Sequence, residues 1–294
     1  MKKIKFLRPH PVDVLIVDEE GNHLVKACIP KNVTFSILPL RGVIPVVASF
    51  KFIFRLFAHS VNLKRIQDAI LFSIIDVLKP KILITKIDNS LIMGRLHEEF
   101  PNKLTISVQN GFRTGPKYNG SYGKYPVSLF YGFGEHDGKR QKSMGIEHKE
   151  YVSSGSLVYG LYKKNQINQN VKNKYDVCFF SQLSYPTFDN PHFTKIANLS
   201  DNMFLDLVKA CKELNLSLVV AMRYEEQNPH YALEFNQLSA IDTEGFAKLI
   251  PNNLAIYEGY NVSFQSNILI SVNSTLGYEM FGAGKKVLFG ASID

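Results

Sequence analysis

Short apolar runs alternate with amphipathic stretches along the whole chain. In the first half, apolar runs of strand length cover residues 12–17, 33–38, 81–87, 104–108, 128–133 and 151–153. Amphipathic stretches of helical length lie between them, at 63–78, 91–100 and 139–144. A repeating order of strand, loop and helix predicts a parallel sheet with helices on both faces.

A polar segment, residues 163–174, separates this half from the next and holds one Ile and one Val among ten polar residues. Such a segment is typical of a linker. After it, the alternation starts again, with strands predicted at 175–180, 216–222 and 254–257 and helices at 202–214 and near 243–249. The sequence therefore predicts two Rossmann-like, doubly wound α/β domains, residues 1–165 and 174–294.

An unusually apolar segment lies between Ile44 and Val61, where Lys51 and Arg55 stand four residues apart. One interpretation is an interfacial helix, which would give the protein a peripheral contact with the inner membrane on its cytoplasmic face. The alternative is a core helix with one solvent-exposed stripe, and the pattern favours this second interpretation.

Composition narrows the function classes. The 294 residues are 45% hydrophobic and 20% charged, which supports a packed core, and the formal net charge is +8. That charge suits anionic ligands, an anionic membrane surface or nucleic acid. Sequence signatures of nucleic-acid-binding modules are absent, so no nucleic-acid partner is expected. Three cysteines in apolar surroundings indicate buried thiols in a reducing compartment, and neither a signal peptide nor a spanning segment is recognisable, so we expect a cytoplasmic location.

One stretch near the C-terminus combines a buried strand, a polar turn and a short helix. Residues 268–272 are largely apolar, and Asn273, Ser274 and Thr275 are residue types that begin helices. A helix that starts at the carboxyl end of a parallel strand presents backbone N–H groups and a positive dipole end, which together bind phosphate. Glu279 lies one turn further on, within reach of a ribose hydroxyl. An ordinary strand–helix–strand unit remains the alternative.

Polar side chains gather at the predicted carboxyl ends of the strands, where doubly wound sheets bind ligands. The first half supplies groups suited to acid–base or sugar-binding chemistry: Asp88, Asn89, Gln109, Asn110, Arg113, Glu135 and His136. The second half supplies neutral donors, a cation and one carboxylate, suited to a nucleotide: Ser181, Gln182, Arg223, Asn273, Ser274, Thr275 and Glu279. Structural alternatives stay open. Asp88 and Asn89 could cap the next helix, Gln109 to Gly111 could be only a turn, and Glu135 and His136 could be surface residues.

With these residues assembled, the chain resembles GT-B glycosyltransferases, and more narrowly bacterial surface carbohydrate (O-antigen or capsule) biosynthesis proteins. The resemblance rests on five short motifs: Ile87-Asp88-Asn89, residues 108–113, residues 132–135, Ser154-Gly155-Ser156 and residues 273–279. It implies two Rossmann-like domains facing a cleft, with a nucleotide-sugar donor on the C-terminal domain and the acceptor glycan on the N-terminal one. GT-B chains usually continue beyond the strand at 287–289, so the resemblance implies a short or truncated C-terminal domain.

The function that these observations predict is transfer of a sugar from a nucleotide sugar to a surface polysaccharide or lipopolysaccharide acceptor. Asp88 is the first candidate for base or nucleophile, with Glu135 or His136 second, and Asn89, Gln109, Asn110 and Arg113 would bind the sugar or acceptor. No cofactor is expected beyond the nucleotide-sugar substrate, and no metal is needed if the helix dipole and Arg223 stabilise the leaving charge. Two alternatives are transfer of an alditol phosphate from a CDP-linked donor and a non-catalytic glycan- or nucleotide-binding subunit.

Overall fold

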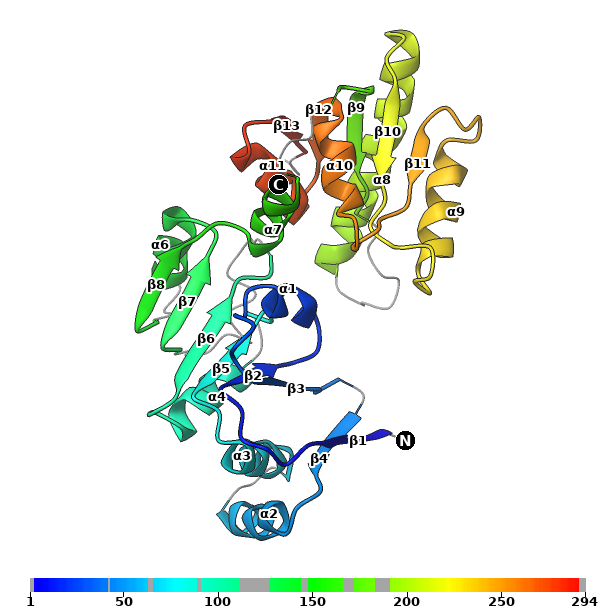
Figure 1. The fold of residues 1–294 in the computed structure, drawn as a ribbon. Coiled ribbons are helices and arrows are strands. Elements are labelled where there is room, and N and C mark those ends of the chain that lie inside the picture. Colours follow the sequence, from blue (N-terminus) through cyan, green and yellow to red (C-terminus); the bar gives the residue numbers. More distant parts are fainter. Residues whose placement is uncertain are drawn as a thin grey trace. The chain divides into compact units, whose positions relative to one another are not determined.

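The computed structural model describes residues 3–41, 43–62, 66–88, 91–111, 127–143, 148–166, 172–182 and 191–290. They belong to two compact units, Met1–Leu161 and Tyr162–Asp294 (Figure 1). Helix α7 (Leu157–Asn165) contains the boundary between the units. The domain limits predicted above, 165 and 174, stay a prediction, and residues 167–171 between them lie outside the described ranges.

The N-terminal unit is built on a six-stranded parallel sheet with the strand order β3-β2-β5-β6-β7-β8. The order reverses direction at β2 and β5, which makes the gap between these two strands the topological switch point of the sheet. The strands are β2 (Val14–Val17), β3 (Phe35–Leu38), β5 (Ile82–Thr85), β6 (Leu104–Val108), β7 (Leu129–Gly132) and β8 (Glu150–Ser153). The helices that connect them are α1 (Asn22–Lys26), α3 (Ile66–Leu78), α4 (Ile92–Glu99) and α6 (Glu135–Ser143).

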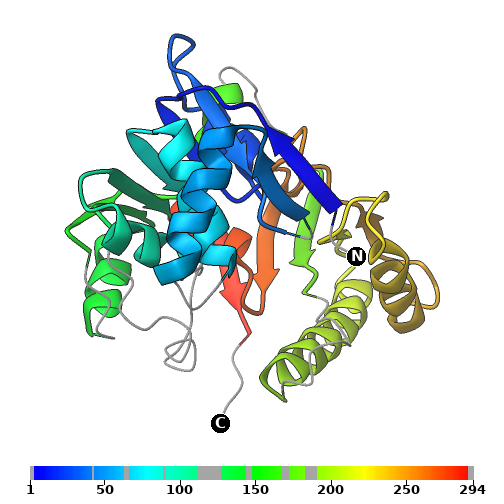
Figure 2. The ribbon, with the colours of Figure 1, turned by 90° about the horizontal axis from the view of Figure 1, so that it is seen from below.

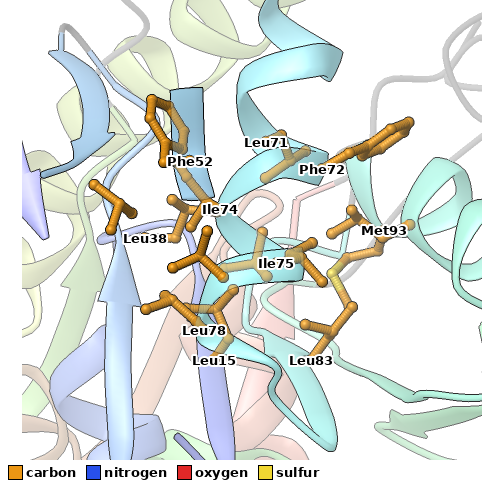
Figure 3. Close-up of a cluster of buried hydrophobic side chains, with 14 of the residues drawn as sticks. Leu15, Leu38, Phe52, Leu71, Phe72, Ile74, Ile75, Leu78, Leu83 and Met93 are labelled. Atoms are coloured by element: carbon orange, nitrogen blue, oxygen red, sulfur yellow. The ribbon is translucent and has the colours of Figure 1, made fainter. Parts of the chain in front are cut away.

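Side chains of β2 alternate between the two faces of this sheet, as the period of a strand requires. Leu15 packs in the core with Leu83 and with side chains of α3 and α4, which Figure 3 shows in close-up. Val14 and Ile16 point to the other face and pack with Val25 of α1. Because both faces are covered, β2 is buried throughout, which explains its uninterrupted apolar sequence.

The apolar segment that the sequence singled out between Ile44 and Val61 forms two elements. β4 (Val43–Val47) pairs in parallel with β1 (Lys3–Leu7) in a separate two-stranded sheet, and α2 (Phe50–Asn62) follows it. Ser49 separates them and accepts the backbone N–H of Phe52 at 3.3 Å. β-branched Val43, Ile44, Val46 and Val47 favour the strand, and Pro45 disfavours a helix interior. The strand β1 was not predicted.

Helix α3 is apolar nearly all round because it lies between the sheet and α2. Its buried residues include Leu71, Ile74, Ile75 and Leu78. α2 packs on α3 as an outer layer, and both views show the two helices side by side (Figures 1 and 2). Among the described residues, no helix is both long enough and apolar enough to cross a bilayer.

The C-terminal unit is built on a five-stranded parallel sheet with the order β11-β10-β9-β12-β13, so its switch point lies between β9 and β12. Right-handed crossovers then place α8 and α9 on one face and α10 and α11 on the other, and α8 and α9 lie side by side in Figure 2. The strands are β9 (Tyr175–Phe180), β10 (Leu218–Ala221), β11 (Lys248–Ile250), β12 (Ser266–Ser271) and β13 (Lys286–Phe289). The helices are α8 (Pro191–Glu213), α9 (Tyr231–Ile241), α10 (Glu258–Phe264) and α11 (Thr275–Gly282).

Two predicted elements before β12 are wrong. The helix expected near 243–249 is replaced by the strand β11, and the strand expected at 254–257 is a turn that leads into α10. Gly245, at positive φ, lies in the turn before β11, and Pro251 directly follows this strand. Tyr257, also at positive φ, stands immediately before α10. The apolar residues here are too few for periodicity to distinguish a strand from a helix turn.

The predicted fold class is confirmed: the chain is α/β, with parallel sheets flanked by helices.

Candidate functional site

The switch point of the C-terminal unit brings together residues that are far apart in the sequence. Gln182 follows β9 and Asn273 follows β12, and the backbone N–H of Asn273 donates to Oε1 of Gln182 at 2.5 Å. Ser181, also after β9, is buried, and its N–H donates to the carbonyl of Ala221 at the end of β10. Three strand ends are therefore tied together at the edge of the sheet where ligands bind in this kind of fold.

Helix α11 begins at this edge, with Ser274 as its N-cap. The side chain of Ser274 makes no capping bond; instead, its backbone N–H donates to Oγ of the buried Ser271 at 3.1 Å. The N–H groups of Leu276 and Gly277 follow in the first turn, where helix geometry provides no acceptor within the helix. The start of α11 thus has the backbone arrangement and the dipole orientation that bind a phosphate group.

Gly277 allows α11 to lie directly against the end of β12. A Cβ atom at this position would come within 2.6 Å of Oγ and 2.7 Å of Cβ of Ser271. Any larger residue would therefore push the helix away from the strand and from Ser271, which engages its N-cap.

Glu279 lies one turn into α11 and is half-buried. The hydroxyl of Tyr260 in α10 donates to Oε2 of Glu279 at 2.5 Å. Tyr260 in turn stacks on Tyr162 with 5.0 Å between ring centroids. The carboxylate is therefore held in a fixed orientation by an aromatic cluster, which a residue that binds ribose hydroxyls would need.

Arg223 follows β10 at the same edge of the sheet. Its side chain is exposed, and its guanidinium lies 5.5 Å from the ring centroid of Tyr224. The backbone that carries it is fixed by Glu234 of α9, a fully buried carboxylate that accepts the N–H groups of Arg223 at 2.9 Å and Tyr224 at 3.0 Å. Glu234 was not among the predicted residues, and the helix that carries it, α9, was not predicted either.

A cavity of about 390 Å³ lies at the carboxyl ends of β10 and β11. It is next to Arg223, whose carbonyl oxygen accepts Nδ2 of Asn252, one of the lining residues, at 3.3 Å. Its volume is in the range of small-ligand pockets. The lining residues are Glu225, Glu226, Gln227, Ile250, Pro251, Asn252, Asn253, Ile256 and Glu258. This cavity was not predicted from the sequence, because residues 254–257 in the loop after β11 were assigned to a strand.

In the N-terminal unit, Gln109 and Asn110 occupy the predicted place after β6, and both are engaged. Gln109 is buried; its Oε1 accepts the N–H of Phe133 at 2.8 Å and its Nε2 donates to the carbonyl of Gly111 at 3.2 Å. Its amide thus joins the ends of β6 and β7. Oδ1 of Asn110 accepts Nζ of Lys86 at 2.6 Å.

Asp88 and Lys86 both follow β5 and are buried. Lys86 was not among the predicted residues, although a lysine that interrupts an apolar run at a strand end was a signal for it. It extends towards Gly21, where a Cβ would come within 2.8 Å of its Cδ. Across the switch point, Asp18 after β2 accepts Nε of Arg41, at 3.1 Å for Oδ2. Asp18 and Arg41 were also not among the predicted residues, and their pairing joins positions 23 residues apart.

Glu135 and His136 begin α6 after β7, and both are exposed. The buried acid of this helix is their neighbour Asp137, which pairs with Arg140 and accepts Nε2 of Gln141 at 3.2 Å. Asn89 and Arg113 lie outside the described residues, so their roles stay predictions, as do those of the other candidate residues.

The fold and these strand-end clusters define a GT-B-like protein with two Rossmann-like units. Residues 106–291, more than half of the chain, match the family described as "putative O-antigen biosynthesis protein", and the chain belongs to this family. The resemblance to bacterial surface carbohydrate biosynthesis proteins that the motifs indicated is confirmed.

Solved structures match nearly the whole chain at low sequence identity. The UDP-GlcNAc 2-epimerase from Methanocaldococcus jannaschii, solved with UDP-GlcNAc and UDP, is 12% identical, with 97% of this chain and 83% of that chain covered and a TM-score of 0.52. A "putative UDP-N-acetylglucosamine 2-epimerase" from Listeria monocytogenes is 13% identical, with 95% and 79% covered and a TM-score of 0.54. Anabaena HepE in complex with UDP is 12% identical, with 94% and 79% covered and a TM-score of 0.51. A search of the curated proteins finds no match.

Proposed function

We propose that this chain is a glycosyltransferase that moves a sugar from a nucleoside-diphosphate sugar to a bacterial surface polysaccharide or lipopolysaccharide acceptor. The observation that carries the proposal is the arrangement after β9 and β12, where Gln182, Ser271 and Gly277 fix the start of α11 and Tyr260 orients Glu279. The neighbours of similar fold that were solved with UDP or UDP-GlcNAc support a nucleotide or nucleotide sugar as the ligand.

In the proposed donor complex, the diphosphate lies against the first turn of α11, with Ser274, Thr275 and the exposed Arg223 as further donors. Glu279 accepts the ribose hydroxyls. The cavity beside Arg223 is large enough for a nucleobase, and its carboxylate and amide oxygens are acceptors for base N–H groups.

The transfer itself exchanges one bond for another. The oxygen of an acceptor hydroxyl forms a bond to the anomeric carbon, and the bond between that carbon and the diphosphate oxygen breaks. The nucleoside diphosphate leaves with the electron pair, and its charge is stabilised by the helix dipole and Arg223. Asp88 accepts the proton of the acceptor hydroxyl, and Lys86 with Asn110 orients the sugar at the neighbouring strand end.

Replacing Asp88 by Asn tests the catalytic half of the proposal. Turnover of the cognate nucleotide sugar should fall by about 10² to 10⁴, the usual contribution of a general base, because the amide cannot accept the proton. Nucleotide affinity should stay at the wild-type value. Unchanged turnover would remove Asp88 from the mechanism.

The donor half is tested by a thermal-shift screen with UDP, CDP, GDP and CMP, since a ligand that binds only the folded state raises the melting temperature. Glu279→Gln should lose the shift given by the best nucleotide. Glu244→Gln, at a side chain that is 77% exposed, is the matched control and should keep it. If the double variant Glu279→Gln with Gln182→Ala keeps the nucleotide-induced rise in melting temperature, the nucleotide binds at another place in the chain.

The fold matches favour one second candidate, epimerisation of the nucleotide sugar itself. One assay distinguishes the two reactions. An epimerase converts the nucleotide sugar to its isomer without any acceptor, and it does not release one nucleotide for each sugar transferred. Nucleoside diphosphate formed only when the acceptor glycan is present would support the transferase.

A further inference from the structure

Helix α2 carries an apolar face that points away from the protein. Its members are spaced i, i+3, i+4, i+7 and i+11, so they form one continuous stripe along the helix. Their exposed fractions are 93% for Phe50, 63% for Ile53, 70% for Phe54, 72% for Phe57 and 71% for Val61.

The opposite face of α2 packs in the hydrophobic core of the N-terminal unit. Phe52 is buried and Leu56 half-buried, and both pack in the core cluster with α3. Figure 1 shows α2 as the outer layer over α3, and the exposed stripe therefore adds nothing to the stability of the unit. Single exposed apolar side chains are common, but a continuous stripe of large ones marks an interaction surface. The helix is apolar on two opposite sides: one side packs in the core, as one interpretation of the sequence predicted, and the other is exposed.

Two cations, Lys51 and Arg55, lie on α2 beside the stripe. Lys51 is exposed, and Nε of Arg55 approaches Oδ2 of Asp76 in α3 at 3.6 Å, an oxygen that Nε2 of His59 also contacts at 3.1 Å. Asp76 also lines a cavity of about 450 Å³ at the amino ends of β5 and β6. The cations of this cavity are Lys79, Lys81 and Lys103, and its carboxylates are Asp76 and Glu99.

Most of these charges face solvent. Lys79 is exposed, and the side chain of Lys81 is 82% exposed although its Nζ lies 3.3 Å from Oδ1 of Asp13. Lys103 is half-buried and donates to the carbonyl of Pro80 at 2.8 Å. Over α2 and this cavity, five Lys and Arg side chains outnumber the three carboxylates Asp13, Asp76 and Glu99, a charge balance that complements an anionic partner.

We propose that the α2 surface, made of Phe50, Ile53, Phe54, Phe57 and Val61 with Lys51, Arg55, Lys79, Lys81 and Lys103 around it, docks on an anionic lipid bilayer. The helix lies in the plane of the interface with its phenylalanines among the acyl chains and its cations at the level of the lipid phosphates, as interfacial amphipathic helices do. This goes beyond the proposed reaction and does not depend on it.

The charge of α2 favours a bilayer over a second copy of the chain. The helix carries Lys51 and Arg55 and no Asp or Glu, so a second α2 offers these cations no carboxylate, whereas lipid phosphates are anionic. A bilayer requires only that the side chains reach about 5–10 Å into the headgroup boundary.

Vesicle flotation tests the proposal with the full chain and needs no substrate. We expect the protein to float with vesicles of phosphatidylcholine and phosphatidylglycerol at low salt and to stay behind with phosphatidylcholine alone. Phe54→Ser combined with Phe57→Ser should lower the bound fraction at least about tenfold, because both rings lose their burial in the bilayer. Leu214→Ser with Leu233→Ser is the matched control: these side chains are 67% and 51% exposed, lie in the other unit and should leave binding unchanged.

A fluorescence measurement locates the contact. The chain contains no tryptophan, so Phe54→Trp introduces a single reporter at a 70% exposed position. Its emission should shift to the blue when anionic vesicles are added, and Lys51→Glu with Lys79→Glu should weaken that shift. A wild-type protein that does not float with anionic vesicles, or a double serine variant that floats as well as wild type, would overturn the proposal. So would a dimer in sedimentation that the serine variant dissociates, without any vesicle binding.

Discussion

At the start of α11, the absence of a side chain at Gly277 allows the helix to lie close to β12. A Cβ on Gly277 would lie 2.6 Å from Oγ of Ser271, whereas a Cβ on Gly282 of the same helix would meet nothing within 4 Å. Gly277→Ala should therefore destabilise the C-terminal unit by about 1–3 kcal/mol through overpacking. Gly282→Ala is the control and should be neutral or stabilising by up to about 1 kcal/mol, because Ala favours helices over Gly. Denaturant unfolding of both variants checks this.

Nucleotide binding extends the same test. If α11 holds the phosphates, Gly277→Ala should weaken nucleotide affinity more than its loss of stability explains, and Gly282→Ala should leave affinity unchanged. Equal stability of the two variants would show that Ser271 can move aside and that the contact does not fix the helix.

Residue types at strand ends were predictable from the sequence, but the partners of those residues were not. Asn273 and Ser274 were recognised because they are residue types that begin helices and they follow a buried strand. Their partners were not predicted. The backbone N–H of Asn273 donates to Gln182, which follows β9, and that of Ser274 donates to Ser271, the last residue of β12. Glu234 and Lys86 were missed because the burial of a charged residue depends on tertiary contacts, and only Lys86, at the end of an apolar run, had a local signal in the sequence.

At the scale of elements, most predicted strands and helices are present, including four-residue strands such as β7 and β8, and the two wrong assignments lie between β10 and β12. The strand at 268–272 and the helix at 202–214 correspond to β12 and α8, each with many apolar positions to define its period. β11 has only three residues, and the seven-residue α10 follows a turn at positive φ in Tyr257. Short elements of this kind are stabilised by neighbouring strands and helices rather than by their own sequence.

The contact of α6 with β7 and β8 provides a pH test at this scale. Tyr151 of β8 stacks on Phe130, donates its hydroxyl to the carbonyl of Gly134 at 3.0 Å and occupies the space left by Gly132 and Gly138. Burial, followed by the nearby charge of Asp137, raises the pKa of Tyr151 from 10.0 to about 12. The unfolded chain therefore loses this proton first, and the stability that the tyrosine contributes is complete below pH 10 and falls as the pH rises towards 12.

Tyr151→Phe should remove that dependence. The difference in unfolding free energy between wild type and Tyr151→Phe should be constant up to about pH 9 and then shift in favour of the variant above pH 10. Urea unfolding across this range measures it. A difference that stays constant through pH 11 would mean that the hydroxyl ionises as readily in the folded protein as in the unfolded chain.

At the scale of the whole molecule, the sequence pattern was sufficient to predict the fold class and the protein family, but it did not determine the reaction. Alternating strands and helices predicted two parallel sheets, and short motifs pointed to surface carbohydrate biosynthesis, as the family match confirms. Strand order, and with it the two switch points, followed only from the structure, because pairing is decided by contacts between residues that are far apart in the sequence, such as Cys178 with Leu269. The assignment of the nucleotide to the C-terminal unit remains a prediction that can be tested for each unit separately.

The three cysteines allow that test because they lie in different environments. Cys28 is exposed and belongs to the N-terminal unit, whereas Cys178 and Cys211 are buried in the C-terminal unit. Burial also raises the pKa of the Cys178 thiol to about 12, which leaves almost no thiolate at neutral pH. In the native protein, we therefore expect a thiol reagent to label Cys28 at once and the other two only when the C-terminal unit unfolds. A nucleotide that binds this unit at 100 times its Kd should slow labelling of Cys178 and Cys211 about 100-fold and leave Cys28 unchanged. If a nucleotide that raises the melting temperature does not slow labelling of the two buried thiols, then the donor binds elsewhere in the chain and the roles proposed for Arg223, Ser274 and Glu279 are wrong.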